Sequence, residues 1–321
     1  MIYIVIILLN TLFCHASVSL EPAKNRMVKQ LVKEVHQNHK IPETWLNTQF
    51  QDLKLNESVL NLMQKPFEAK PWTSYERLML SQKRIHSGQT FMLQHRDVLS
   101  YYEAKYQIPA SVVSSIIGIE TSYGTNKGNF NGLEALTTLA FYYTPRSQFF
   151  RGEMISLLRY AYKNQIATKD IKSSYAGAVG IPQFMPSNID LYGRHHGKTG
   201  KLDLYNDPND AIASVFNYLK VVGRWKPNQA VMKRLDLPKQ QHQSLLKMMG
   251  DTRMLPVTKS IEQHYNLRHQ PKTWIIKLQT SDHEYTLYRV FENFKSIMSY
   301  NNSVHYSSAV YELSKRLQPA S

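Results

Sequence analysis

Glu120 is the residue of this chain whose position most favours proton-transfer chemistry. It ends the stretch 110–120, in which positions 112, 113, 116, 117 and 120 fall on one face at the helical period. Because the other positions on this face are aliphatic, the carboxyl group lies in an apolar stripe, at a place where another buried aliphatic side chain would be expected. Burial would raise its pKa, as a general acid near neutral pH requires. For one glutamate on one helix, partial exposure in the last turn is the more common explanation, so the other motifs decide.

Three other motifs that could do chemistry fail on their spacing. Residues 193–199 resemble a phosphate-binding loop, but the motif is one residue short and no hydrophobic strand precedes it. His195 and His196 are adjacent, so a regular helix or strand would point them apart, and no His-Glu-x-x-His pair exists. No Gly-x-Ser-x-Gly elbow supports a serine hydrolase. The sequence therefore predicts no nucleotide site, no zinc site and no serine nucleophile.

The elements that must position Glu120 are mostly helical. From about residue 26 to residue 106, amphipathic segments are interrupted at Pro42, Pro66 and Pro71. The helical pattern is densest between residue 109 and about residue 224. Gly124, four residues after Glu120, can end the helix that carries the carboxyl group.

The later part of the chain predicts a small β structure. Residues 227–251 form another polar stretch with a helical pattern. Two alternating segments, 273–278 and 285–290, are separated by polar residues and predict a hairpin. The tail returns to a helical pattern near residues 309–313. The expected fold class is therefore mainly α (α+β).

The net charge restricts the class of partner. The chain carries a formal net charge of +15, which favours polyanions such as nucleic acid, an anionic membrane or an anionic cell-wall polymer. It has no zinc-finger spacing, basic zipper or aromatic RNA-binding signature, so specific nucleic-acid binding is not expected. With 42% hydrophobic residues the chain can build cores, as a globular protein does.

The first residues predict export. Residues 1–13 are almost continuously apolar and small residues follow, which predicts a signal peptide over 1–19, although no Lys or Arg precedes the apolar run. The run is shorter than the ~20 residues that span a bilayer. Cys14 is the only cysteine, and Phe13 before it is too large for a lipoprotein signal, so lipid anchoring is less expected. We expect a soluble periplasmic protein without a transmembrane anchor after processing.

Several segments together resemble one enzyme family. In chain order these segments are 117–124, 136–141, 174–187, 207–218 and 300–303. Their sequences and their order are similar to the core of the B-type lytic murein transglycosylases of glycoside hydrolase family 103. They extend across most of the chain that would remain after export.

The resemblance implies a lysozyme-like helical core flanked by a helical domain and a small β-containing domain. The implied boundaries follow the signal peptide: an N-terminal helical domain over 20–106, the catalytic core over 107–226, the β-containing domain over 227–292, and a C-terminal segment over 293–321 that returns to the catalytic groove. Peptidoglycan glycan strands are the implied partner, and the sequence leaves open whether cell-wall synthesis or division proteins bind the chain.

The implied reaction cleaves the β-1,4 bond from N-acetylmuramic acid to N-acetylglucosamine without water. Glu120 would protonate the leaving oxygen and then, as a carboxylate, take the proton from the C6 hydroxyl of muramic acid. That hydroxyl attacks C1 and closes a 1,6-anhydro ring, with assistance expected from the 2-acetamido group. Because the nucleophile comes from the substrate, the reaction needs no second catalytic carboxylate and no cofactor.

The resemblance assigns substrate contacts to five residues of the core. Ser174 would hydrogen-bond near the acid or the acetamido group, although an ordinary loop serine is the alternative. Gln183, Phe184 and Met185 would line the floor of the groove, and core packing explains Phe184 and Met185 equally well. Arg146 would bind the carboxylates of the muramyl peptide, whereas a lone surface arginine would be unremarkable.

Four further residues are implied, and three of them come from more distant parts of the sequence. Tyr75 and Tyr123 would face sugar rings, since aromatic faces suit carbohydrate C–H groups, but a chain with 20 tyrosines weakens any single assignment. Tyr300 and Asn301 would reach the catalytic centre from the C-terminal segment.

The chain departs from the family in two places beside the groove. Phe149 stands where the family often has a tyrosine, so a hydrogen bond to the glycan would be lost. Pro182 stands where a second glycine is common, which stiffens the loop before Gln183. Neither change removes the proposed acid.

The calcium loop that family members can carry is a third departure. Its expected oxygen donors fall on His195, Gly197, Thr199 and Lys201. Imidazole, glycine and ammonium groups are poor ligands for a hard cation, and the local charge is positive. Asp207, Pro208 and Asp210 need no metal, since a helix beginning there would use them as cap, first residue and acidic neighbour of its positive end. We therefore predict no metal.

Two other functions remain open at this point. A hydrolytic lysozyme-like muramidase could use the same acid and would add water to the product. A non-catalytic peptidoglycan-binding protein would need Glu120 or its supporting residues to be inactive.

Overall fold

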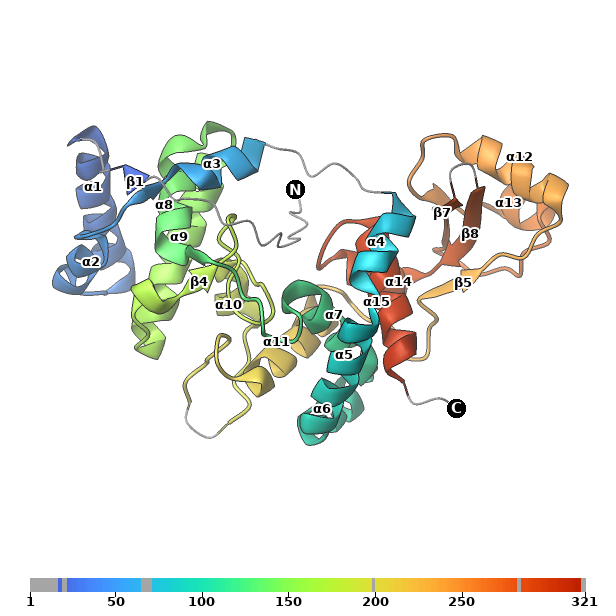
Figure 1. The fold of residues 1–321 in the computed structure, drawn as a ribbon, viewed down its shortest axis with the longest axis horizontal. Helices are drawn as coiled ribbons and strands as arrows, with labels where there is room; N and C mark the ends of the chain where they lie inside the picture. Colours follow the sequence, from blue (N-terminus) through green and yellow to red (C-terminus); the bar gives the residue numbers. More distant parts are fainter. Residues whose placement is uncertain (1–16, 19–21, 65–70, 198–199, 282–283, 319–321) are drawn as a thin grey trace. The chain divides into compact units, whose positions relative to one another are not determined.

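The computed structural model describes residues 17–18, 22–64, 71–197, 200–281 and 284–318 (Figure 1). The described residues divide into two compact units. Unit 1 contains residues 71–119 and 216–318, and unit 2 contains residues 17–64 and 120–215. Each unit is therefore built from segments that are distant in the sequence.

Unit 2 is mainly helical. In chain order its elements are β1 (Ser17–Val18), α1 (Pro22–His39), α2 (Glu43–Phe50), β2 (Leu55–Asn56), α3 (Glu57–Gln64), β3 (Phe130–Asn131), α8 (Gly132–Tyr142), η1 (Thr144–Arg146), α9 (Ser147–Asn164), η2 (Thr168–Asp170), β4 (Lys172–Ser173) and α10 (Pro186–Tyr192). It also holds the end of α7 (Ala110–Thr121) and the beginning of α11 (Pro208–Val221).

Helices α8 and α9 pack against each other and form the core of unit 2. Helix α8 begins where Asn131 accepts hydrogen bonds from the backbone N–H groups of Leu133 (2.9 Å) and Glu134 (3.1 Å). Helix α9 ends at Asn164, and the capping residue Gln165 adopts a left-handed conformation. Their buried apolar side chains include Leu133, Leu136, Leu139, Phe150, Met154, Leu157 and Leu158. This core supports the loops that carry the candidate site.

The predicted signal peptide lies almost entirely outside the described residues, and so does Cys14. At its end Ser17 and Val18 form β1, which pairs antiparallel with Asn56 and Leu55 of β2. Among the helices that the structure describes, none combines the length and apolar content needed to cross a membrane.

Unit 1 combines a helical part with a small sheet. Its helices are α4 (Trp72–Met79), α5 (Gln82–Gln94), α6 (Arg96–Tyr106), most of α7, the second half of α11, α12 (Lys239–Met249), α13 (Lys259–His264), α14 (Glu292–Met298) and α15 (Val304–Leu317). The interruptions predicted at Pro42 and Pro71 are confirmed as helix starts, because each proline directly precedes a helix. Pro66 lies outside the described residues.

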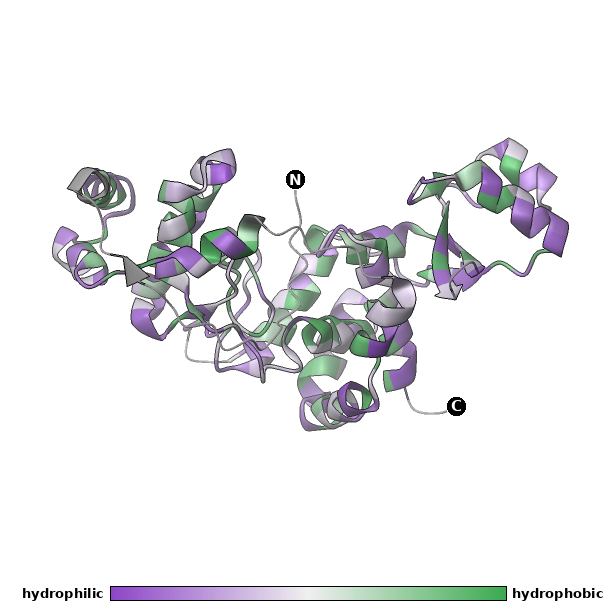
Figure 2. Cartoon of the chain, turned by 45° about the horizontal axis from the view of Figure 1, so that its top comes forward, coloured by the Kyte–Doolittle hydropathy of each residue, from purple (hydrophilic) through white to green (hydrophobic). Residues whose placement is uncertain are grey.

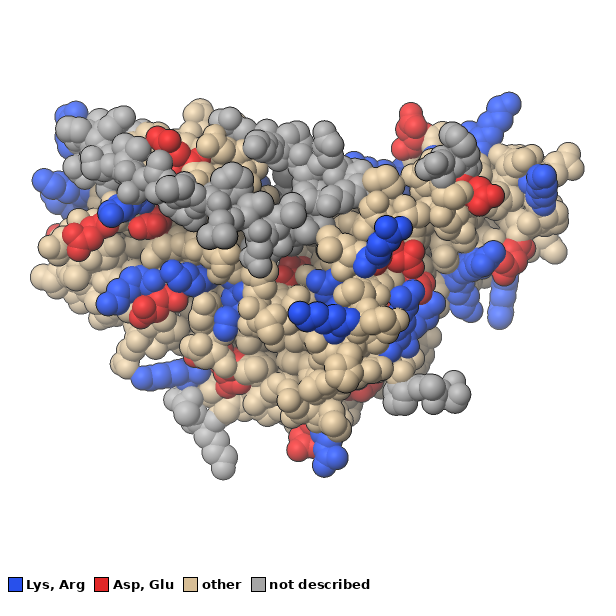
Figure 3. All heavy atoms as spheres, in the orientation of Figure 1, with Lys and Arg blue, Asp and Glu red and all other residues tan. Residues whose placement is uncertain are grey.

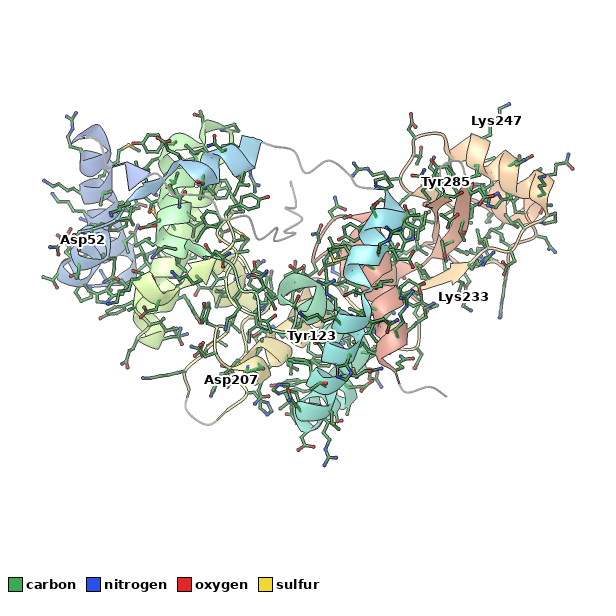
Figure 4. The ribbon with its side chains drawn as sticks, viewed as in Figure 1. Asp52, Tyr123, Asp207, Lys233, Lys247 and Tyr285 are labelled. Carbon is green, nitrogen blue, oxygen red and sulfur yellow. The ribbon has the colours of Figure 1, made fainter. Side chains whose placement is uncertain are left out.

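The sheet of unit 1 is antiparallel and has the strand order β5-β8-β7-β6. Its strands are β5 (Met232–Arg234), β6 (Leu255–Pro256), β7 (Trp274–Ser281) and β8 (Glu284–Val290). The pair β7 and β8 confirms the predicted hairpin, and Figure 4 labels Lys233 and Tyr285 on two of the strands. A buried cluster joins the sheet to α12 and α13: Leu245, Met249, Ile261, Tyr265, Ile275 and Leu287.

The helical pattern predicted over 227–251 is wrong in its first half. Met232 is buried, and β5 pairs with β8 through Met232, Lys233 and Arg234. Leu235 continues this ladder by donating its N–H to the carbonyl of Leu287 (2.9 Å). Pairing with a distant strand therefore outweighs the local pattern, and α12 begins only at Lys239.

The predicted fold class, mainly α with a small β-containing part, is confirmed. Figure 2 shows helices that carry both hydrophobic and hydrophilic residues along their length, as amphipathic packing requires. The predicted domain boundaries stay predictions.

Candidate active site

The candidate acid lies in the last turn of α7. Three consecutive residues after Thr121 have positive φ angles: Ser122 at 48°, Tyr123 at 60° and Gly124 at 84°. The Thr121 hydroxyl accepts a hydrogen bond from the Gly124 N–H (3.0 Å) and donates to the carbonyl of Ile181 (2.9 Å). The end of α7 is thereby tied to the loop 174–187, whose sequence resembles a family motif.

Glu120 is less buried than the apolar stripe predicts. Val112, Val113, Ile116 and Ile117 are buried, whereas Glu120 is partly exposed. Thr121, the next and last residue of the helix, is buried again, so the partial exposure is confined to the Glu120 position. A raised pKa for Glu120 stays a prediction. Tyr123, labelled in Figure 4, is also partly exposed.

Ser174 is fully buried and closes a tight loop. Its N–H donates to the carbonyl of Ala178 (2.9 Å), and its Oγ accepts from the Ala178 N–H (3.1 Å). Gly177 inside this loop has a φ of +85°, and a Cβ there would lie 2.3 Å from a methyl group of Leu136. These contacts account for Ser174 as a loop residue, and its contact with the glycan stays a prediction.

Gln183 has an unused acceptor. Its φ angle is positive, and its Nε2 donates to the carbonyls of Gly180 (2.9 Å) and Lys127 (3.3 Å). The side chain is 7% exposed, and its Oε1 has no hydrogen-bond partner within the described residues. A buried acceptor of this kind usually has a partner, and either a water molecule or a ligand donor would serve.

Phe184 and Met185 differ in their surroundings. Phe184 is buried, and its backbone N–H and C=O both pair with Val179 (3.1 and 2.8 Å). For Phe184 the structure therefore supports the core-packing alternative rather than the groove floor. Met185 is partly exposed and directly precedes α10, so it remains a candidate for the groove.

Arg146 contacts the position where the chain departs from the family. Its guanidinium carbon lies 4.1 Å from the centre of the exposed Phe149 ring and 5.4 Å from that of Phe150. A guanidinium over an aromatic face is attracted to it and is partly fixed in orientation. Phe149 thus supports Arg146, while the expected contact of Arg146 with a peptide carboxylate stays a prediction.

Tyr75, Tyr300 and Asn301 belong to unit 1. Tyr75 is buried, lies parallel to Trp72 (6.3 Å between ring centres) and contacts His305. This packing accounts for the burial of Tyr75, and its contact with a sugar ring stays a prediction.

Tyr300 meets Tyr218 edge to face, at 5.1 Å between ring centres. Asn301 is buried, and its Oδ1 lacks a hydrogen-bond partner in the described part of the chain. Tyr300 and Asn301 belong to unit 1, whereas Glu120, Ser174 and Gln183 belong to unit 2. The glycan contacts of Tyr300 and Asn301 stay predictions.

Asp210 organises the loop where calcium would be expected. It is fully buried, and its carboxylate accepts hydrogen bonds from the backbone N–H groups of His196 and Asp203 (both 2.8 Å). His195 Nδ1 lies 3.0 and 3.1 Å from its two oxygens. Asp210 therefore does more than complement the helix end. The N–H donors around it do not fit a hard cation, which needs oxygen ligands.

Asp207 is confirmed as the cap of α11, since its Oδ1 accepts a hydrogen bond from the Asn209 N–H (2.8 Å).

Calcium or a chelator is expected to leave both the melting temperature and glycan cleavage unchanged, because N–H groups already satisfy Asp210. Thermal melts and sacculus digestion with calcium, with magnesium as the control cation, and with chelator test this. A calcium-specific stabilisation of several degrees would contradict it.

The sequence interpretation missed Glu153 of α9. This side chain is 4% exposed and lies on the buried face of the helix that also carries Phe150, Met154 and Leu157. It hydrogen-bonds Ser187, at the end of the motif 174–187. A carboxyl group within an apolar stripe was the same signal that singled out Glu120.

The Transglycosylase SLT domain model matches residues 23–315 of this chain. Because the match covers nearly the whole sequence, the protein belongs to this transglycosylase family. The resemblance seen in the sequence motifs is thereby confirmed.

Individual relatives agree with the family. The chain is 31% identical to membrane-bound lytic murein transglycosylase B of Escherichia coli over 91% of its own length and 82% of the relative. Soluble lytic transglycosylase SltB1 of Pseudomonas aeruginosa shares 30% identity and a TM-score of 0.80, over 91% of this chain and 98% of that one.

A third relative was solved with a peptidoglycan fragment. SltB3 of Pseudomonas aeruginosa, in complex with NAG-anhNAM-pentapeptide, shares 25% identity and a TM-score of 0.80, over 94% of this chain and 80% of that one. The fold is thus lysozyme-like, and the chain is a B-type lytic transglycosylase that acts on peptidoglycan.

Proposed function

We propose that Glu120 is the single catalytic acid and base with which this enzyme cleaves peptidoglycan. One observation carries the assignment: Thr121 ties the last turn of α7 directly to the loop that presents the unused acceptor of Gln183. A carboxyl group and a ligand-binding amide are thereby held on connected segments of one unit. Such fixed positioning is a major part of catalysis by proton transfer.

The reaction balances with one carboxyl group. Glu120 gives its proton to the glycosidic oxygen as the bond from C1 of N-acetylmuramic acid breaks, which releases the N-acetylglucosamine hydroxyl. The C6 hydroxyl of the same muramic acid then bonds to C1, and its proton returns to the Glu120 carboxylate. No water is consumed, and the 1,6-anhydro product carries no reducing end.

Substrate binding is proposed for three residues of unit 2. Gln183 offers its buried Oε1 to a sugar hydroxyl or acetamide N–H, and the partly exposed Met185 contacts the ring. Arg146, supported by Phe149, is the cation for a stem-peptide carboxylate. The pentapeptide fragment bound by the Pseudomonas SltB3 supports this class of ligand.

The charge of the chain suits an anionic cell-wall polymer. Lys and Arg side chains are scattered over the face seen in Figure 3 rather than gathered in one stripe. A dispersed cationic surface favours loose attraction to a polyanion over reading a particular duplex. We propose that the protein works in the periplasm, where peptidoglycan is located, after removal of the predicted signal 1–19.

The products of digestion separate this reaction from hydrolysis. Isolated sacculi treated with the enzyme are expected to release muropeptides lighter by one water than those from a muramidase, because the C6 hydroxyl replaces water as the nucleophile. Mass spectrometry of the products, with a hydrolytic muramidase digest as the control, makes the comparison. Muropeptides at the hydrolysed mass would establish the alternative, and a lack of release would favour a non-catalytic binding protein.

A further inference from the structure

Glu153 is a buried carboxylate that the proposed proton transfers do not use. It lies on α9 among apolar side chains and is 4% exposed. A leucine would pack there without the desolvation that an ionised group suffers. Retaining a carboxylate at such a place calls for a role that an apolar side chain could not fill.

Both oxygens of Glu153 are directed at one residue, Ser187. Oε2 accepts the backbone N–H of Ser187 (2.8 Å), and Oε1 accepts its side-chain hydroxyl (2.7 Å). Ser187 is the second residue of α10, so the carboxylate holds the first turn of that helix by its backbone and its side chain together. Burial raises the pKa of Glu153, while the Ser187 hydrogen bonds and the Arg146 charge oppose that rise.

The turn held by Glu153 is continuous with the groove residues. Gln183, Phe184 and Met185 directly precede α10, and no glycine separates them from Ser187. Phe184 is anchored by its two backbone hydrogen bonds with Val179. The segment is therefore fixed at Phe184 on one side and at Ser187 on the other, which leaves Met185 little freedom between them.

We propose that Glu153 is a positioning residue of the transglycosylase reaction: through Ser187 it fixes the start of α10 and, along the segment 183–185, the proposed glycan contacts Gln183 and Met185. This inference rests on the proposed function of Gln183 and Glu120. Glu153 itself does not touch the reacting atoms. Glu153 instead determines the positions of the Gln183 amide and the Met185 side chain.

Two other charged groups face Glu153, from η1 and from α10. Arg146 is the cation, and Asp190 is the second carboxylate, paired with Arg159 at 2.9 Å. Asp190 lies on the same helix as Ser187 but is bonded to Arg159 instead of Glu153. The variant Asp190→Asn therefore removes a carboxylate from this region without releasing the first turn of α10, and it is the matched control.

The first experiment compares four single variants in turnover, sacculus binding and thermal melting. Glu153→Ala and Ser187→Ala are expected to lower turnover about tenfold or more with a smaller loss of binding, since small misplacements of binding groups reduce the rate strongly. Glu153→Gln is expected to retain most of the turnover, because its amide can still accept from the Ser187 N–H and donate to its hydroxyl. Asp190→Asn should match the wild type.

The second experiment is a double-mutant cycle with Gln183→Ala. If Glu153 acts through the segment 183–185, Glu153→Ala should cost much less turnover once the Gln183 amide is gone. Fully additive losses would overturn the proposal. It would also be overturned if Glu153→Gln were as slow as Glu153→Ala, or if turnover merely followed the loss of melting temperature.

Failure of this inference is distinguishable from failure of the proposed function. If Glu120→Gln remains active, the assignment of the acid is wrong, whatever Glu153 does. If Glu120→Gln is inactive while Glu153→Ala turns over like the wild type, the acid stands and Glu153 is not a positioning residue.

Discussion

Replacing Glu120 by glutamine is expected to abolish turnover while preserving the fold and binding to sacculi. The amide has nearly the size of the carboxyl group, but it cannot donate a proton to the leaving oxygen and take one back from the C6 hydroxyl. Since both proton transfers depend on this group, the loss should be at least about 1,000-fold. Release of soluble muropeptides measures turnover, and co-sedimentation with sacculi measures binding.

The control for this variant is Glu134→Gln on α8. Glu134 is also partly exposed and helical, and it belongs to the same unit, but its side chain has no part in the proposed chemistry. It should keep the turnover and the melting temperature of the wild type. Turnover near the wild-type rate in Glu120→Gln would show that another group supplies the proton.

Replacing Gly128 by alanine is expected to disturb both stability and activity. Gly128 has a φ of +95°, and a Cβ there would lie 2.0 Å from the carbonyl oxygen of Ser173 and 2.7 Å from the Ser174 nitrogen. These are backbone atoms, so the chain must move away from Ser173 and Ser174. We expect the melting temperature to fall by at least about 5 °C, with a further loss of turnover because Ser174 opens the candidate loop.

Gly152→Ala provides a matched glycine control. Gly152 lies inside α9, and an added Cβ would meet nothing within 4 Å. Alanine favours a helix interior over glycine by up to about 1 kcal/mol, so this variant should melt at the wild-type temperature or slightly above it. Equal melting temperatures for Gly128→Ala and the wild type would contradict this prediction, because they would show that the loop accommodates the added methyl group without loss of stability.

Sequence patterns correctly predicted the secondary-structure elements that depend on interactions between residues close together in the chain. The hairpin of β7 and β8 follows from alternation within 18 residues, and α2 and α4 begin directly after Pro42 and Pro71. Long-range pairing decided β5, where Met232 meets Val290, and a pattern read over neighbouring residues could not anticipate that partner.

The candidate site was predictable only in part, for the same reason. A carboxyl group in an apolar stripe is visible in the sequence, but its partner is not. Glu153 and Ser187 are 34 positions apart, and Asp210 joins His196 and Asp203 through backbone groups that carry no sequence signature. Phe184 illustrates the converse, because an aromatic residue in a family motif can serve packing.

The left-handed turn after Glu120 has an energetic consequence for the whole protein. Ser122 and Tyr123 are not glycines, and each L-residue in this region costs roughly 1 kcal/mol or more. Since the free energy of unfolding of a typical domain is only about 5–15 kcal/mol, this is a considerable loss of stability for a single turn. Selection for heat tolerance alone would favour glycine or asparagine at both positions. The turn that follows the acid is therefore built at a cost in stability that glycine at these two positions would lower.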